Sequence, residues 1–108
     1  MNGSSVVNDL EWAKVLVLST AHLGESIATP DDDEPAPMDH LANMSGQDGW
    51  LVYTGYDSAY YKAKLARGAP SAVDVFVDLM HWARKHGARY VLFDSDGPTV
   101  SGFPTYNW

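Results

Sequence analysis

The chain has 108 residues, which suits one small domain with one modest core. It contains no cysteine, which excludes disulfides, thiolate catalysis and cysteine-ligated zinc. Its formal net charge is -7, and a field of this sign repels phosphate backbones and disfavours direct nucleic-acid binding.

The charge is unevenly distributed along the chain. Residues 1–61 hold ten acids and one base, or -9, whereas residues 62–108 hold four acids and six bases, or +2. The acidic half would attract a basic protein surface. The complementary halves also allow self-association, so a homodimer is a further alternative. No signal peptide and no apolar run of roughly 20 residues is present, and we expect a cytoplasmic protein without membrane contact.

The first elements are a strand and a short helix. Residues 1–9 look like a frayed terminus, and the apolar run KVLVLS at 14–19 predicts a buried strand. Ser19 or Thr20 could then cap a short helix over 21–28.

An acidic, proline-rich segment follows at residues 29–39. TPDDDEPAPMD contains three prolines and four consecutive acids, a composition that breaks regular structure. We expect an exposed acidic loop, or the solvated start of a helix over 38–44, where acids near the N-terminus are favourable.

GWLVYTGY at 49–56 predicts the second strand, and apolar residues on both of its faces suggest a central one. Trp50 is expected in the core. Asp57 can cap a short helix through about residue 66. Tyr56 and Tyr60 border a loop, and tyrosine is enriched at interface hot spots.

The clearest element is a helix over residues 72–86. Apolar residues recur there at three- and four-residue steps. Ser71 is the expected N-cap, with Asp74 completing a start like a capping box, and Gly87 is the expected left-handed stop.

The last fifth of the chain predicts a strand at 88–94, a turn at 94–98 and a final edge strand at 99–103. The aromatic C-terminus predicts a tail docked on the core. The order of elements predicts an α+β (or small α/β) fold over a single domain, 1–108. Its sheet would have three to four strands, with helices packed mainly on one face.

Three segments resemble a family of small uncharacterised proteins carried by plasmids, integrative elements and phages. They are VLVLSTAHL (15–23), DGWLVYT (48–54) and HGARYVLFDSDGPTVSGFPTYNW (86–108). The resemblance implies a mobile-element context, in which small acidic proteins are often inhibitors of host defence.

FDSDGPTV, at 93–100, also resembles the nucleophile motif of haloacid-dehalogenase-type phosphatases. That chemistry needs a hydroxyl residue, a lysine and further carboxylates on later strands. Only 14 residues follow Asp94, so we interpret the motif as a strand followed by a turn.

A small hydrolase or metal-dependent enzyme built on His22, Asp94 and Asp96 is the alternative function, because neighbouring strand ends could bring the three together. A structural role for His22 is the competing interpretation. The sequence shows no zinc-type histidine pair, no phosphate-binding loop and no dinucleotide fingerprint, so no cofactor is expected.

The function that the sequence favours is a non-enzymatic acidic binding protein. It would inhibit a host nucleic-acid defence protein, of anti-CRISPR or anti-restriction type, by occupying a basic surface. The partner would be a basic host protein or nucleic-acid-binding complex, with carboxylates standing in for phosphates. The candidate contact residues are Asp31, Asp32, Asp33, Glu34, Asp39, Tyr56 and Tyr60.

Overall fold

The structure is a computed structural model that describes residues 12–46 and 49–108. Its elements are β1 (Val15–Ser19), the 3-10 helix η1 (Thr20–His22), α2 (Glu25–Ala28), α3 (Pro37–Leu41), β2 (Met44–Gly46), β3 (Gly49–Tyr53), α4 (Ser58–Lys64), α5 (Pro70–Lys85) and β4 (Tyr90–Asp94).

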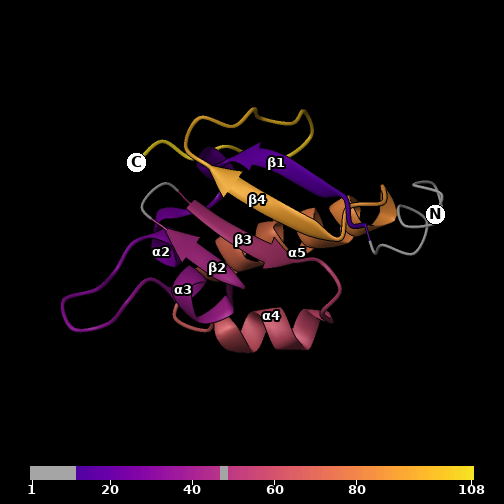
Figure 1. Cartoon of the computed structure of the whole chain (residues 1–108). Coiled ribbons are helices and arrows are strands. Elements are labelled where there is room, and N and C mark those ends of the chain that lie inside the picture. Colours follow the sequence, from indigo (N-terminus) through magenta and orange to yellow (C-terminus); the bar gives the residue numbers. More distant parts are fainter. Residues whose placement is uncertain (1–11, 47–48) are drawn as a thin grey trace, which may run out of the picture.

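In the described part of the chain, the strands form one four-stranded sheet in the order β1-β4-β3-β2 (Figure 1). β1 and β4 are parallel, whereas β4, β3 and β2 are successively antiparallel. The strand predicted at 49–56 is β3, and it occupies a central place in the sheet, as its apolar residues on both faces predict.

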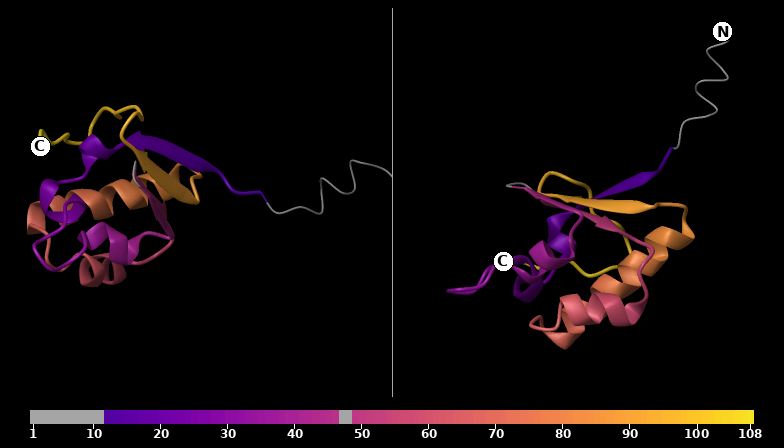
Figure 2. Two further views of the ribbon diagram at one scale, coloured as in Figure 1. Left: turned by 60° about the vertical axis from the view of Figure 1, so that its left-hand side comes forward. Right: turned by 60° about the horizontal axis from the view of Figure 1, so that its bottom comes forward.

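The helices gather on one side of this sheet (Figure 2). Val52, Val91 and Phe93 point to that side and are fully buried, together with Phe76 from α5. The predicted α+β class, with a small sheet covered mainly on one face, is confirmed.

The strand predicted at 14–19 forms, but it is not buried as expected. β1 lies at one edge of the sheet, and Val15 and Val17 are 46% and 39% exposed. Its other side chains, Leu16 and Leu18, turn toward the core. A continuous apolar run predicted burial on both faces, but only one face has a covering layer.

The helices near the acidic segment are shorter than predicted. The helix expected over 21–28 is divided into η1, which Ser19 caps, and α2. The helix expected over 38–44 ends at Leu41. Residues Met44–Gly46 form the short edge strand β2, which the sequence pattern did not predict.

α5 is confirmed, although it begins two residues before the predicted start. Pro70 occupies its first turn and Ala69 is the N-cap, so the expected caps Ser71 and Asp74 lie inside the helix. Proline is well suited to the first turn because it lacks the N–H that would have no helical partner there. Gly87 has φ +94°, as a left-handed stop requires.

The edge strand predicted at 99–103 does not form. This segment instead belongs to a C-terminal tail that is hydrogen-bonded to the end of β1 and to η1. Ser19 N–H donates to Pro98 O at 2.7 Å, and Tyr106 N–H donates to Ala21 O at 2.7 Å. The docked tail is thereby confirmed. The frayed terminus predicted at residues 1–9 lies outside the described residues.

Candidate functional site

The acidic loop between α2 and α3 is a narrow, closed turn. Asp31 N–H donates to Glu34 O at 3.0 Å, and Glu34 N–H donates back to Asp31 O at 3.3 Å. This pair of hydrogen bonds places Asp32 and Asp33 at the tip, where both side chains are exposed. The loop projects from the body of the protein at the left of Figure 1.

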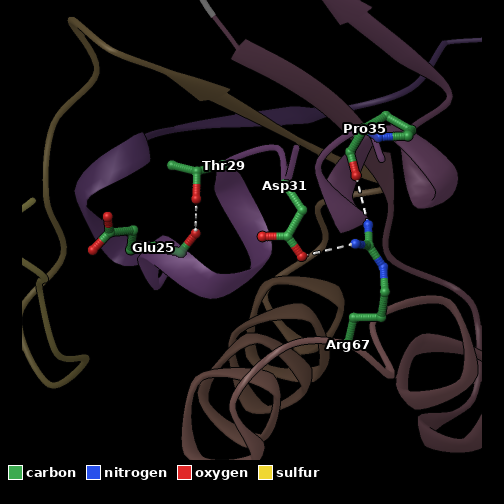
Figure 3. A network of polar contacts seen from close by, with 5 residues as sticks. All are labelled: Glu25, Thr29, Asp31, Pro35 and Arg67. Atoms are coloured by element: carbon green, nitrogen blue, oxygen red, sulfur yellow. Dashed lines mark hydrogen bonds and ion pairs between the residues drawn. The ribbon is translucent and has the colours of Figure 1, made fainter. Parts of the chain in front are cut away.

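Arg67 clamps the base of this loop (Figure 3). Its guanidinium donates to Asp31 Oδ2 at 3.3 Å and to Pro35 O at 2.6 Å, so it spans the segment that enters the loop and the one that leaves it. The Asp31 side chain is 81% exposed, and the ion pair itself therefore contributes at most about 1 kcal/mol to stability. The clamp mainly fixes the shape of the loop.

The acidic candidates therefore divide into held and free carboxylates. Asp31 is paired with Arg67, and Asp39 accepts a hydrogen bond from Trp50 Nε1 at 2.8 Å. Asp32, Asp33 and Glu34 are exposed, and all three carboxylates carry charge into solvent. Trp50 packs on the core while its ring N–H reaches the surface.

Tyr56 and Tyr60 stack on each other, with ring centroids 4.0 Å apart and planes inclined by 25°. Tyr60 is 38% exposed, whereas Tyr56 packs partly against the core. This pair lies at the start of α4. Arg67, which holds the acidic loop, follows the end of α4. The structure thus separates the aromatic candidates from the acidic ones, and their joint use by one partner stays a prediction.

Tyr61 lies beneath that pair and is fully buried. Its hydroxyl donates to Tyr53 O at 2.7 Å, and burial raises its pKa from 10.0 to about 12. Burial has this effect because the tyrosinate anion is poorly solvated inside the protein.

We expect stability to fall as the pH rises from about 10 to about 12. In that window unfolded Tyr61 has lost its proton, whereas the folded state still binds it, so deprotonation favours unfolding. The loss in the free energy of unfolding should reach up to about 3 kcal/mol. Urea unfolding of the wild-type protein and of Tyr61→Phe at pH 7 and pH 12 measures this loss. At pH 7 the wild-type protein should have the higher free energy of unfolding, by about 1 kcal/mol, and at pH 12 this difference should vanish or reverse. An unchanged difference would contradict the assignment.

His22 is buried, and backbone groups of the C-terminal tail occupy both of its ring nitrogens. Val100 N–H donates to Nε2 at 2.9 Å, and Nδ1 lies 2.9 Å from Pro104 O. Since Nε2 accepts, Nδ1 carries the proton and donates. Neither nitrogen is left to abstract a proton or bind a metal. The geometry favours the structural role and gives the hydrolase hypothesis no support.

The Asp94–Asp96 segment forms the predicted turn. Asp94 Oδ1 accepts from Asp96 N–H at 2.9 Å, and Asp94 O accepts from Gly97 N–H at 2.9 Å. A Cβ added at Gly97 would lie 2.7 Å from the backbone carbonyl of Leu18, so the turn is packed directly on β1. Among residues 12–46 and 49–108, no three His, Asp or Glu side chains gather as metal ligands would.

The sequence pattern does not predict two features of the structure. The first is the clamp by Arg67, which contacts a carboxylate 36 positions earlier in the chain. The excess of prolines and acids in the loop suggested exposure but not a fixed shape. The second is the uncovered face of the sheet. The continuous apolar run of β1 predicts burial on both faces and therefore gives no sign of the open one.

A sequence profile described as the C-terminal domain of a family of unknown function, DUF5983, matches residues 15–108. No curated protein and no solved structure has significant similarity to the chain. Within the part of the chain that the structure describes, no helix has both the length and the apolar composition needed to cross a membrane.

Proposed function

The chain belongs to the DUF5983 C-terminal domain family, whose function is unknown, and we propose that this member is a non-enzymatic binding protein that docks its acidic loop on a basic protein surface. The observation that carries the proposal is the clamped shape of the loop, with free carboxylates on Asp32, Asp33 and Glu34.

A fixed loop has an energetic advantage over a flexible acidic tail. Ordering a flexible segment on binding costs conformational entropy, and each immobilised side chain adds about 0.5–1.5 kcal/mol. The hydrogen bonds between Asp31 and Glu34 and the contact from Arg67 to Pro35 order the backbone before any partner arrives. Only the rotamers of the tip side chains remain to be fixed.

The partner that fits this loop is a surface rich in arginine and lysine. Three free carboxylates on three successive residues, Asp32, Asp33 and Glu34, can accept charge-assisted hydrogen bonds, as phosphates do. A surface of that kind in the cytoplasm commonly serves nucleic acid, so occupying it would inhibit nucleic-acid binding. The resemblance to mobile-element proteins makes a host defence protein, of anti-CRISPR or anti-restriction type, our specific choice of partner. Charge mainly accelerates such association and sets its orientation.

The test compares the wild-type protein with Asp32→Asn/Asp33→Asn/Glu34→Gln. Both are used to capture host proteins at 50 mM and 300 mM salt, and each captured protein is titrated against both variants. We expect the neutralised loop to weaken binding by roughly 10- to 100-fold at low salt, since each exposed charge contributes up to about 1 kcal/mol. The difference should shrink at high salt, where the Debye length is shorter. Double-stranded DNA should compete with the wild-type protein for the same partner.

The matched control is Asp74→Asn/Asp78→Asn/Asp96→Asn. It removes three exposed negative charges as well, but from α5 and the turn after β4. If the control loses as much affinity as the loop variant, overall charge and not the loop governs binding. If DNA does not compete, the surface that the loop occupies is not a nucleic-acid site.

A further inference from the structure

The face of the sheet opposite the helices, hereafter the open face, carries an apolar row that crosses all four strands. Val17 pairs with Leu92, Leu92 with Leu51, and Leu51 with Met44, and directly paired residues point to the same face of a sheet. Val17 and Met44, at the two ends of the row, are 39% and 67% exposed. The helices lie on the other side of the sheet, as the right-hand view of Figure 2 shows, so this row is open to solvent.

An open hollow of about 480 Å³ lies on this face. Its lining is largely apolar and includes Val15, Met44, Leu51 and Leu92, with Asp94 at one end. Small-molecule sites commonly have volumes of about 300–1,000 Å³ and an apolar lining in which a few polar groups fix the orientation of the ligand. The hollow has both the size and the composition of such a site.

Two glycines make room in the hollow beside Asp94. Asp94 pairs with Gly49 on β3, and Gly49 pairs with Gly46 on β2, so neither of these two positions places a side chain next to the carboxylate. A Cβ built at Gly46 would meet nothing within 4 Å, which shows that the space above this residue is empty of protein. Glycines permit a ligand to approach the strand backbone closely, and here that approach leads to Asp94.

Asp94 supplies the charge in the lining. Among the described residues that line the hollow, it is the one with a charged side chain, and it is half-buried. Its Oδ1 accepts a hydrogen bond from Asp96 N–H at 2.9 Å, which holds the carboxylate in place. A carboxylate forms shorter and stronger hydrogen bonds with a cationic donor than a neutral pair does. The apolar lining and the fixed carboxylate are therefore complementary to an apolar molecule that carries an ammonium group.

The size of the open face favours a small molecule over a protein. Four strands spaced by about 4.8 Å, with up to five residues rising about 3.3 Å each, cover roughly 300 Å² in projection. A standard protein interface buries about 800 Å² on each partner, which is far more than this face offers. A molecule of about ten to fifteen non-hydrogen atoms fits within the volume of the hollow.

We propose that the hollow on the open face binds a small organic amine, with its apolar body on Leu51, Leu92 and Met44 and its ammonium group at the Asp94 carboxylate. This site is separate from the acidic loop between α2 and α3. Apolar contact supplies most of the affinity, because one partly exposed ion pair changes a dissociation constant by no more than about fivefold. The carboxylate selects amines over neutral and acidic molecules of the same shape.

Titrations of the full chain with three probes of one shape test the proposal, with amide shifts in ¹H–¹⁵N NMR spectra as the readout. The probes are 3-phenylpropylamine, 3-phenylpropan-1-ol and 3-phenylpropanoate, each added up to 20 mM at pH 7. We expect the amine to bind with a dissociation constant of roughly 1–5 mM. The alcohol should bind about threefold to fivefold more weakly than the amine, and the carboxylate at least about tenfold more weakly. The largest shifts should occur at Gly46, Leu51, Leu92 and Asp94.

Three variants assign the binding to the hollow. Asp94→Asn keeps the Oδ1 acceptor for Asp96 N–H and should abolish the preference for the amine over the alcohol. Asp96→Asn, the matched control, removes an exposed negative charge two residues away from a side chain outside the lining, and the preference should persist. Gly46→Leu places a side chain in the empty space above β2. It should weaken the amine and the alcohol at least tenfold, with an unchanged circular dichroism spectrum.

An amine that gives no saturable shift up to 20 mM would overturn the proposal. So would a carboxylate probe that binds as tightly as the amine, or an amine affinity that both Asp94→Asn and Gly46→Leu leave unchanged. Spectra of the protein alone from 0.05 to 1 mM test the other occupant. Shifts at Leu51 and Leu92 that depend on protein concentration would show that a second copy covers the open face, and the small-molecule site would then be wrong.

Discussion

His22→Ala should lower the free energy of unfolding by about 3 to 5 kcal/mol and release the C-terminal tail from its seat. Small domains have total stabilities of about 5 to 15 kcal/mol, so the variant should be close to unfolding at physiological temperature. The melting temperature should fall by at least about 12 °C, since a domain of this size loses roughly 4–8 °C per kcal/mol.

The magnitude follows from what the imidazole satisfies. Without it, Val100 N–H and Pro104 C=O lose their partners at 2.9 Å. Both hydrogen bonds are partly buried, and each contributes about 0.5–1.5 kcal/mol. A cavity is also left, because the side chain is only 1% exposed. The tail has other anchors, among them the Trp108 ring N–H bonded to Leu23 O, and these limit the loss.

Thermal unfolding measures the loss of stability. Tryptophan fluorescence measures the release of the tail, because Trp108, which is already 51% exposed, then loses its ring hydrogen bond to Leu23 O. His22→Asn keeps a donor near the Nδ1 position, and His22→Gln keeps an acceptor near Nε2. Each should lose roughly half as much stability as His22→Ala. A His22→Ala protein with wild-type stability would contradict the structural role and revive a catalytic one.

The fold could be predicted where local pattern and tertiary environment agree. α5 followed from its three- and four-residue apolar spacing, and β3 from apolar residues on both faces. The strand predicted at 99–103 failed for a physical reason. Its pattern of β-branched and aromatic residues is equally satisfied by a tail whose backbone bonds to His22 and whose Phe103 packs on Trp82.

The candidate site was predictable in position but not in shape. The prolines and acids of 29–39 indicate an exposed loop from composition alone. The clamp by Arg67 requires α4 to end beside the loop, which no local pattern specifies. The open face has the same origin: whether Val17 is buried depends on the absence of a layer above it, and a strand sequence does not encode that.

Gly49→Ala should cost about 3 kcal/mol or more and separate β3 from β4 at one end of the sheet. A Cβ built at Gly49 would lie 1.7 Å from Phe93 O and 2.8 Å from its carbonyl carbon, so backbone and not a flexible side chain must move. Phe93 is fully buried and stacks near Phe76, which resists any shift of β4 toward the core. The strain therefore falls on the pairing of Gly49 with Asp94.

Gly46→Ala is the matched control, since Gly46 pairs with Gly49 across the same end of the sheet and a Cβ there would meet nothing within 4 Å. It should change stability by less than about 0.5 kcal/mol, or raise it slightly by restricting the unfolded chain. Urea unfolding compares the two variants, and amide exchange at Trp50 and Asp94 reports the local separation. Equal stability for both variants would mean that β3 and β4 do not approach each other this closely at Gly49.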